Sequence, residues 1–176
     1  MRSRRAQGFA LIDVVFVIGM IGILCTMALP RLLLAKQAAS AASAISSMRA
    51  VNSAELTYAL TCGSGFYAPN LSTLGQAPPG SNEAFITAEL GTADTVNKSG
   101  YTIQLSGTPY ANAPATCNGL GPGAAAQAFK AGADALEPTN IRFFATNSNS
   151  VIYEFTASIY AIMPESGEPA SGAPIH

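Results

Sequence analysis

An apolar run near the N-terminus constrains this chain more than any other feature. Residues 9–29 read FALIDVVFVIGMIGILCTMAL, and Asp13 is the one charged side chain among them. About 20 such residues cross the hydrocarbon core of a bilayer as a helix. Arginines are concentrated in the short segment before the run, residues 1–8, while Arg31 and Lys36 follow the run. This charge distribution predicts a cytoplasmic N-terminus and an exported C-terminal part.

Three kinds of segment fit such a run. A cleaved secretory signal needs small residues in an A-x-A-like arrangement, which residues 25–30 do not supply cleanly. A lipoprotein signal at Cys25 needs a small residue just before the cysteine, where this chain has Leu24. An uncleaved anchor fits the hydropathy but leaves Asp13 unexplained, because a carboxylate in the apolar core costs roughly 2.5 to 3.5 kcal/mol on insertion scales.

Composition narrows the function classes. The 176 residues correspond to one domain of ordinary size, with 11% charged residues and a net charge of -1. We expect no nucleic-acid partner, because phosphate neutralisation needs clustered Lys and Arg. The single histidine, His176, ends a Pro/Gly/Ser-rich tail. A buried catalytic imidazole or a His-rich metal site is therefore not expected, which argues against several classes of enzyme.

The junction between the basic leader and the apolar run has a motif of its own. Residues 8–13 read GFALID, from Gly8 through Phe9 to Asp13. This arrangement resembles the prepilin motif of type IV pilins and type II secretion pseudopilins. Gly22 and Pro30 also fall where many members of that family carry glycine and proline. We expect the helix to bend at these two positions. At Pro30 the physical reason is that proline removes one internal hydrogen bond.

The resemblance implies a defined maturation. In that family a prepilin peptidase cuts after the glycine, here between Gly8 and Phe9, and methylates the new N-terminal residue, Phe9. The acidic residue is usually Glu; Asp13 keeps the charge on a side chain one methylene shorter. The implied partners are the prepilin peptidase, an inner-membrane assembly platform, membrane lipid, and copies of itself or related pilins in a helical filament. The implied location is the bacterial inner membrane, single-pass with the C-terminus periplasmic, and then a periplasmic or cell-surface filament.

Electrostatics agrees with that role for Phe9 and Asp13 in subunit assembly. A free α-amino group titrates near ~7.7 to 8.0, so the new amine at Phe9 is mostly cationic at neutral pH. In a packed bundle of helices, this amine and Asp13 of a neighbour neutralise each other, whereas either alone is a buried unpaired charge. The pair predicts both attraction and axial register between subunits.

Helical character continues beyond the apolar run. Residues 31–61 contain neither Gly nor Pro and are rich in Ala, which predicts one helix over 9–61 that stops at Gly63. At 100° per residue one stripe is predicted to pack against a small globular domain. Its members are Leu34, Ala38, Ala41, Ala42, Ile45, Met48, Leu56 and Leu60.

Short elements are predicted in the rest of the chain. Asn70 can cap a turn of helix at residues 70–74, and residues 83–90 suit another. Strands are predicted at residues 101–105, 141–146 and 151–155, with an edge strand at 159–163. Residues 124–136 suit a helix by composition and a strand by alternation, and we favour the strand. The tail, residues 164–176, is predicted to be disordered.

Three segments extend the family resemblance into this half of the chain. They are AVNSAELTYALTCGSGFYAPNLSTLG, SGYTIQLSG and IRFFATNSNSVIYEFT. These resemble the helix end, the first strand and the closing hairpin of small prepilin-type proteins. The resemblance implies an α+β fold in which a long N-terminal helix, transmembrane in its first half, packs on an antiparallel sheet of three to four strands.

The cysteines divide between the two parts of the chain. Cys25 lies in the apolar run and is expected to behave as a small apolar residue. Cys62 and Cys117 lie in the exported part, where an oxidising periplasm permits a disulfide. Such a bridge would tie the helix end to the loop at residues 107–123, and the alternative is two free thiols.

We predict no cofactor and no dedicated metal site. Pseudopilins sometimes bind calcium in a loop, so the resemblance leaves calcium open for Glu83, Glu89 and Asp94. Their spacing matches no dedicated ligand motif, and a solvated acidic surface is the alternative.

The sequence thus predicts five segments and one principal function. The segments are a cleaved leader (1–8), a transmembrane and assembly helix (9–29), its continuation (30–61), a periplasmic or extracellular head (62–163) and the tail (164–176). The predicted function is a structural subunit of a type IV pilus or a type II secretion pseudopilus. The alternative is a single-pass anchored periplasmic binding or enzymatic domain, which would retain residues 1–8.

Overall fold

The structure is a computed structural model that describes residues 11–175 of the chain. The chain divides after Ala39 into two compact units. The later part of the long helix therefore belongs to the second unit, the folded head. The helices are α1 (Leu11–Thr61), α2 (Leu71–Leu74) and α3 (Ala88–Gly91). The strands are β1 (Thr95–Lys98), β2 (Tyr101–Ser106), β3 (Lys130–Ala135), β4 (Phe143–Asn147), β5 (Ile152–Phe155) and β6 (Ala173–Ile175).

The predicted long helix is confirmed over the residues that the structure describes. Helix α1 runs through Gly22 and Pro30 to Thr61 as one continuous α-helix. Pro30 has no N–H to donate to the carbonyl group of Thr26 four residues earlier. The hydroxyl group of Thr26 in turn donates to the carbonyl oxygen of Ile23 at 2.7 Å.

The α+β class and the antiparallel sheet are confirmed, but the predicted number of strands is wrong. Within residues 11–175 the sheet has six antiparallel strands, not three to four, in the order β1-β2-β3-β4-β5-β6. The additional strands are the two edges. The sequence of β1, TVNK, lacks an alternation of apolar and polar residues. This edge strand forms through backbone hydrogen bonds to its neighbour, which do not require such a pattern.

The prediction of a disordered tail is also wrong for residues 173–175, which form a strand. Strand β6 pairs with β5, placing Ile175 opposite Ile152. The segment before β6 is held by the buried side chain of Asn147, whose amide group donates to the carbonyl oxygens of Pro164 at 3.0 Å and Gly167 at 2.7 Å. These hydrogen bonds come from a strand distant in sequence, so composition alone could not predict them.

The predicted edge strand at residues 159–163 is a turn. The N–H of Met163 donates to the carbonyl oxygen of Ile159 at 2.9 Å, and both side chains are buried. With Ala145 and Tyr153 they form a small second core on the outer face of the sheet. The neighbouring ring of Tyr160 lies over Gly132, where an added Cβ would come within 2.8 Å of it. The apolar residues of this turn therefore cover the sheet instead of extending it.

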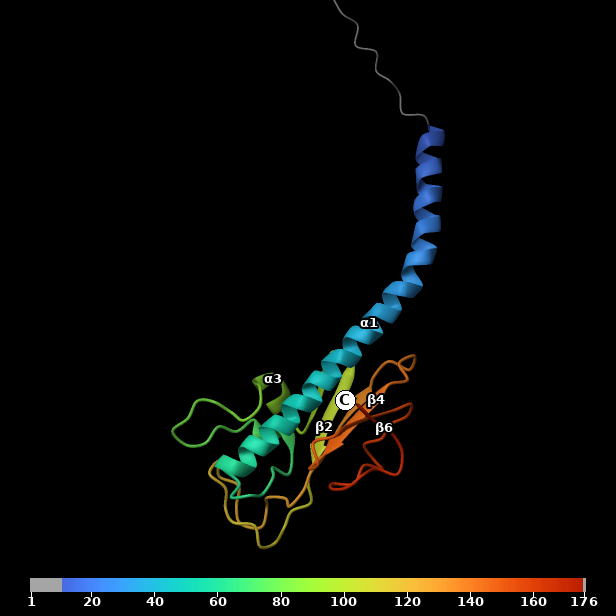
Figure 1. Cartoon of the computed structure of the whole chain (residues 1–176). Helices are drawn as coiled ribbons and strands as arrows, with labels where there is room; N and C mark the ends of the chain where they lie inside the picture. Colours follow the sequence, from blue (N-terminus) through green and yellow to red (C-terminus); the bar gives the residue numbers. More distant parts are fainter. Residues whose placement is uncertain (1–10, 176) are drawn as a thin grey trace, which may run out of the picture. The chain divides into compact units, whose positions relative to one another are not determined.

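The main core lies between the sheet and the C-terminal part of α1, which crosses one sheet face (Figure 1). Alternate residues of β2 point into this core. Small residues of β3, Ala131 and Ala133, face the same way and leave room for the helix. Helix α1 contributes a buried stripe to this core, namely Ala41, Ala44, Met48, Val51, Ala54 and Tyr58.

The buried helix face differs from the predicted stripe. Ala41 and Met48 are buried as expected, but Leu56 is 54% exposed and Leu60 is 76% exposed. In an Ala-rich helix several faces are similarly apolar, so contacts with the sheet, and not the pattern of apolar residues along the helix, decide which face packs. Val51 and Tyr58 occupy the core, and this rotation leaves the two leucines in solvent.

The connection between α1 and β1 contains the two short helices. Asn70 caps α2 as predicted, with its side-chain oxygen accepting a hydrogen bond from the N–H of Thr73 at 3.0 Å. Helix α3 occupies the end of the second predicted turn. The two helices meet at Gly75 and Gly91, where a Cβ added to Gly75 would lie 2.2 Å from the carbonyl oxygen of Gly91. Glycine is required at this close approach.

Candidate functional site

The N-terminal part of α1 presents a long, mainly apolar surface. From Leu11 to Leu34 every large apolar side chain is exposed, with exposed fractions between 43% for Val14 and 80% for Leu11. Within residues 11–175, α1 is long and apolar enough to cross a membrane. Contiguous apolar surface of this extent indicates a membrane or a protein partner, because water solvates it poorly.

Asp13 lies in the first turn of α1, on this apolar segment, and is exposed. It forms no ion pair with any residue in the part of the chain that the structure describes. Gly8 and Phe9, the predicted cleavage and methylation residues, lie outside the described residues. The structure therefore places Asp13 on the exposed apolar segment.

Two glycines open the surface of the same segment. A Cβ added at Gly19 or Gly22 would meet nothing within 4 Å. Small residues on an apolar helix allow a second helix to approach closely. Cys25 follows on the same segment as a free, exposed thiol.

The structure joins Cys62 and Cys117 in a disulfide, with the Cα atoms 4.9 Å apart. The bridge connects the residue after α1 to the long loop between β2 and β3. A backbone hydrogen bond from the N–H of Cys117 to the carbonyl oxygen of Cys62, at 3.2 Å, reinforces it. Both predicted cysteines therefore fix a loop to the end of the helix.

Asn118 extends this attachment to α2 and to the core. Its side-chain amide donates to the carbonyl oxygen of Thr73 at 2.9 Å, while its oxygen accepts from the hydroxyl group of Thr116 at 2.7 Å. The hydroxyl group of Tyr58 donates to the same oxygen at 3.4 Å. Burial raises the pKa of Tyr58, so its phenol remains a donor. Helix α1, α2 and the loop thus share one polar junction.

Glu55 is a carboxyl group buried in the head. It is 0% exposed, and its Oε2 accepts a hydrogen bond from the N–H of Ala68 at 2.9 Å. Its Oε1 has no hydrogen-bond partner among the described residues. Burial raises the pKa of Glu55 well above its usual range, and the Ala68 hydrogen bond opposes that rise. Burial therefore shifts the balance between the two forms toward the neutral acid in the folded head.

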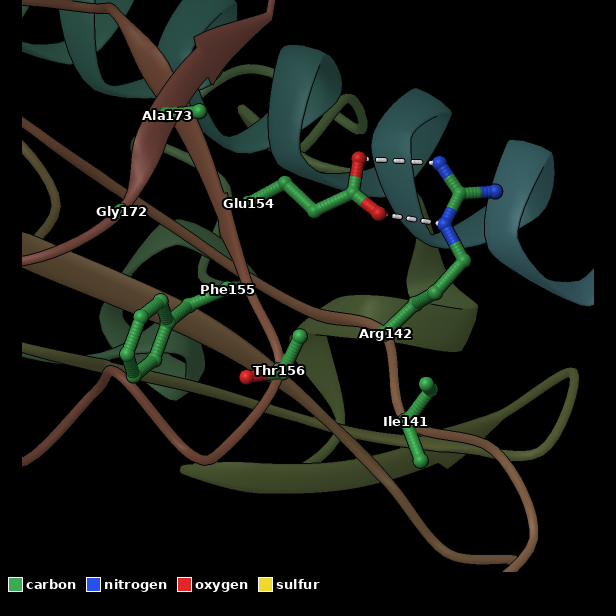
Figure 2. Close-up of a pocket in the computed structure, with 7 residues that line it drawn as sticks. All are labelled: Ile141, Arg142, Glu154, Phe155, Thr156, Gly172 and Ala173. Carbon is green, nitrogen blue, oxygen red and sulfur yellow. Dashed lines mark hydrogen bonds and ion pairs between the residues drawn. The ribbon is translucent and has the colours of Figure 1, made fainter.

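A shallow groove lies at the β5–β6 end of the sheet (Figure 2). It has a volume of about 500 Å³, and its lining residues are Ile141, Arg142, Glu154, Phe155, Thr156, Gly172 and Ala173. Figure 2 shows the guanidinium group of Arg142 facing the carboxylate of Glu154 through two hydrogen bonds. The hydrogen bonds from Arg142 lower the pKa of Glu154, which keeps it charged. Both charges are already satisfied by each other, so the free lining of the groove is mainly apolar.

Two of the three carboxylates considered for calcium, those of Glu89 and Asp94, have other partners. Glu89 forms an ion pair with Lys98 at 2.8 Å, and Asp94 accepts a hydrogen bond from Ser72. The N–H of Glu83 donates to Ser81. Across residues 11–175 no three or more His, Cys, Asp or Glu side chains gather as metal ligands would. The structure does not bring the three candidates together.

The sequence analysis missed Glu55 and the Arg142–Glu154 pair. A signal for Glu55 was present, because it follows Met48 and Val51 at spacings that keep it on the buried helix face. No local signal marked the pair. Arg142 precedes β4 and Glu154 lies in β5, and the antiparallel pairing of these strands brings the two residues together.

Comparison with known proteins found no relative of this chain. No family model matches the chain, and neither a curated protein nor a solved structure matches it. Two features of the chain itself bear on its function. They are the exposed apolar segment with Asp13, and the disulfide-bonded head that continues from it.

Proposed function

We propose that this chain is a prepilin-type structural subunit of a type IV pilus or a type II secretion pseudopilus. The observation that carries the proposal is the N-terminal part of α1. It combines an apolar surface exposed from Leu11 to Leu34 with a single acidic residue, Asp13. The same helix continues into an α+β head. The GFALID junction at residues 8–13 supports the same assignment.

In this proposal the chain is a substrate of an enzyme and not an enzyme itself. The subunit is stored in the inner membrane with its head in the periplasm. A prepilin peptidase removes residues 1–8 and methylates Phe9, and an assembly platform then adds the subunit to a filament. Lipid covers the apolar surface of α1 in the membrane, and the helices of neighbouring subunits cover it in the filament. The surface that is exposed in a single chain is therefore covered in both states.

Asp13 has a separate role in the filament. Cleavage creates an amine at Phe9, and Asp13 of an adjacent subunit neutralises it in the apolar interior. The amine exists only after processing, which makes assembly depend on cleavage. Gly19 and Gly22 support close packing of the same helices, since a Cβ added at either position would meet nothing within 4 Å.

The test is coexpression of the full chain with a prepilin peptidase, read by intact mass. The wild-type chain is expected to lose its first eight residues and gain one methyl group, the cleaved bond being Gly8–Phe9. Gly8→Ala should slow the cleavage, and Gly8→Leu should block it. A catalytically inactive peptidase is the matched control.

An unshortened wild-type product would contradict the proposal. It would favour the alternative, a single-pass anchored periplasmic domain that retains its leader. Shortening of the Gly8→Leu variant to the same mass would also contradict it, because the cut would then not depend on the motif.

A further inference from the structure

The loop between β3 and β4 carries two exposed apolar side chains. Leu136 is 51% exposed and Ile141 is 63% exposed, although most apolar residues of the neighbouring strands are buried. Ile141 also lines the groove beside the Arg142–Glu154 pair. We call Leu136, Ile141 and the residues between them the 136–141 loop.

Hydrogen bonds attach this loop to the turn between β1 and β2. The N–H of Leu136 donates to the carbonyl oxygen of Gly100 at 3.0 Å. The side-chain amide of Asn140 donates to the hydroxyl group of Tyr101 at 2.9 Å, and both residues are buried. The loop is therefore fixed to the end of the sheet where β2 begins.

That end of the sheet contacts the first residues of α1 within the head. Ser43 donates through its hydroxyl group to Ser99 at 2.9 Å. A Cβ added at Gly100 would lie 3.9 Å from the hydroxyl oxygen of Ser40. The 136–141 loop thus lies at the end of the head where the chain arrives from the apolar segment.

Chain length limits how far this end can be from that segment. Leu34 is the last of the exposed large apolar residues in the N-terminal part of α1, and Ser40 follows six positions later. Six residues span at most about 22 Å even when fully extended. Whatever the orientation of the head, Ser40 and the contacts around it remain close to the end of the apolar segment.

We propose that the 136–141 loop docks on the lipid surface through Leu136 and Ile141 while the subunit is stored in a membrane. The inference rests on the membrane location in the proposed function, and it assigns a second contact with lipid. The attraction is apolar: the charge of Arg142 is neutralised by Glu154, and Glu137 is exposed and acidic. Anionic lipid is therefore not required, and zwitterionic lipid suffices.

The chain contains no Trp, so single-Trp variants report on each position. The full chain is reconstituted into phosphatidylcholine vesicles with and without bromine on the acyl chains near the headgroup. The test variant is Ile141→Trp. The matched control is Leu60→Trp, also exposed and apolar but twenty residues beyond Ser40 along α1, or about 30 Å. Phe16→Trp reports on the apolar segment itself.

We expect the brominated lipid to quench Ile141→Trp several-fold more than Leu60→Trp, and to quench Phe16→Trp as well. Adding Leu136→Ser to the Ile141→Trp variant should reduce that quenching severalfold, since the loop loses one of its two apolar contacts. This loss separates docking from mere closeness to the bilayer.

Three outcomes would overturn the inference. Quenching of Phe16→Trp without greater quenching of Ile141→Trp than of Leu60→Trp would show that the segment enters the bilayer while the loop stays in water. An emission shift of Ile141→Trp that depends on protein concentration and not on brominated lipid would show that a second copy covers the loop. Failure of Phe16→Trp to be quenched would reject the membrane location and this inference together, whereas cleavage at Gly8 is measured separately.

Discussion

At the scale of single residues, Glu55 links the stability of the head to pH. Its carboxyl group is buried, accepts one hydrogen bond from Ala68 and has a raised pKa. An unfolded chain ionises this group near its usual value of 4.5, whereas the folded head holds the proton to higher pH. The stabilising contribution is therefore complete below about pH 4.5 and is lost as pH rises through the folded-state pKa.

We predict that Glu55→Gln flattens this part of the pH profile. Gln keeps an oxygen that accepts from Ala68 but cannot ionise, so it removes the penalty of a buried charge. Each unit of pKa difference corresponds to about 1.4 kcal/mol, and the variant should gain stability relative to wild type as pH rises. The measurement is the free energy of unfolding in urea, followed by circular dichroism across a pH series.

Parallel pH profiles of wild type and Glu55→Gln would contradict this prediction. The comparison must be made between variants, because Asp134 also has a pKa raised by burial while Glu154 has one lowered by Arg142. Subtracting the two profiles cancels both of those contributions.

Asp13 is the residue on which assembly is predicted to depend. Asp13→Ala should reach the membrane but polymerise poorly, because the Phe9 amine of each neighbour would be left unpaired. Breaking a buried charge pair on one side typically costs ~3 to 5 kcal/mol. Asp13→Glu restores the residue that is usual in prepilin-type proteins and should assemble at least as well as wild type.

The measurement is the yield of sheared filaments, or of pseudopili on overexpression, at equal membrane levels of mature subunit. Wild-type yield from Asp13→Ala would show that Asp13 does not set the register between subunits. Helix packing alone would then hold the polymer together.

At the scale of elements, the disulfide fixes the long β2–β3 loop to the end of α1. Cys62 and Cys117 are separated by 55 positions, and closing a loop of that length removes chain entropy worth about 4 kcal/mol in the unfolded state. We predict that Cys62→Ser with Cys117→Ser lowers the free energy of unfolding by up to that amount. Limited proteolysis should then cut within residues 107–123. Without the disulfide, this loop keeps the hydrogen bonds of Asn118 but loses its covalent attachment to the helix.

Cys25→Ser is the matched control for this prediction. Cys25 is a free, exposed thiol on the apolar segment, so its loss should leave the stability of the head unchanged. Equal stability of the double variant and the control would show that the bridge contributes nothing to the head. Non-reducing peptide mapping should also recover Cys62 linked to Cys117 and Cys25 alkylated.

At the scale of the whole molecule, the boundary after Ala39 separates two kinds of surface. The unit from Ser40 to His176 contains the sheet and the main core, to which α1 contributes residues from Ala41 onward. We predict that a chain beginning at Ser40 folds alone as a water-soluble monomer with a cooperative thermal transition. The full chain should instead require detergent or lipid, because the apolar residues up to Leu34 are exposed.

Sedimentation and thermal circular dichroism of the two chains check this prediction. Aggregation of the shorter chain, or a broad transition without cooperativity, would show that the head depends on residues before Ser40. A full chain that remains monomeric in water would contradict the membrane or filament role of the N-terminal segment.

The sequence by itself determined the elements that carry a strong local signal. Residues 31–61 lack Gly and Pro, so α1 could be predicted through them to Thr61. The apolar run identified a helix that is long and apolar enough to cross a membrane, and the side chain of Asn70 marked the start of α2. Strands β2, β4 and β5 were predicted because apolar and aromatic residues mark them directly. In each case the deciding interactions lie within a few residues of one another.

Only the tertiary structure decided the features that depend on distant partners. Strands β1 and β6 exist because neighbouring strands accept and donate their backbone hydrogen bonds, and their own sequences carry little pattern. The face of α1 that packs was fixed by Val51 and Tyr58 meeting the sheet, which left Leu56 and Leu60 exposed. A local pattern records what a residue prefers, whereas burial and pairing depend on which surfaces the fold brings together.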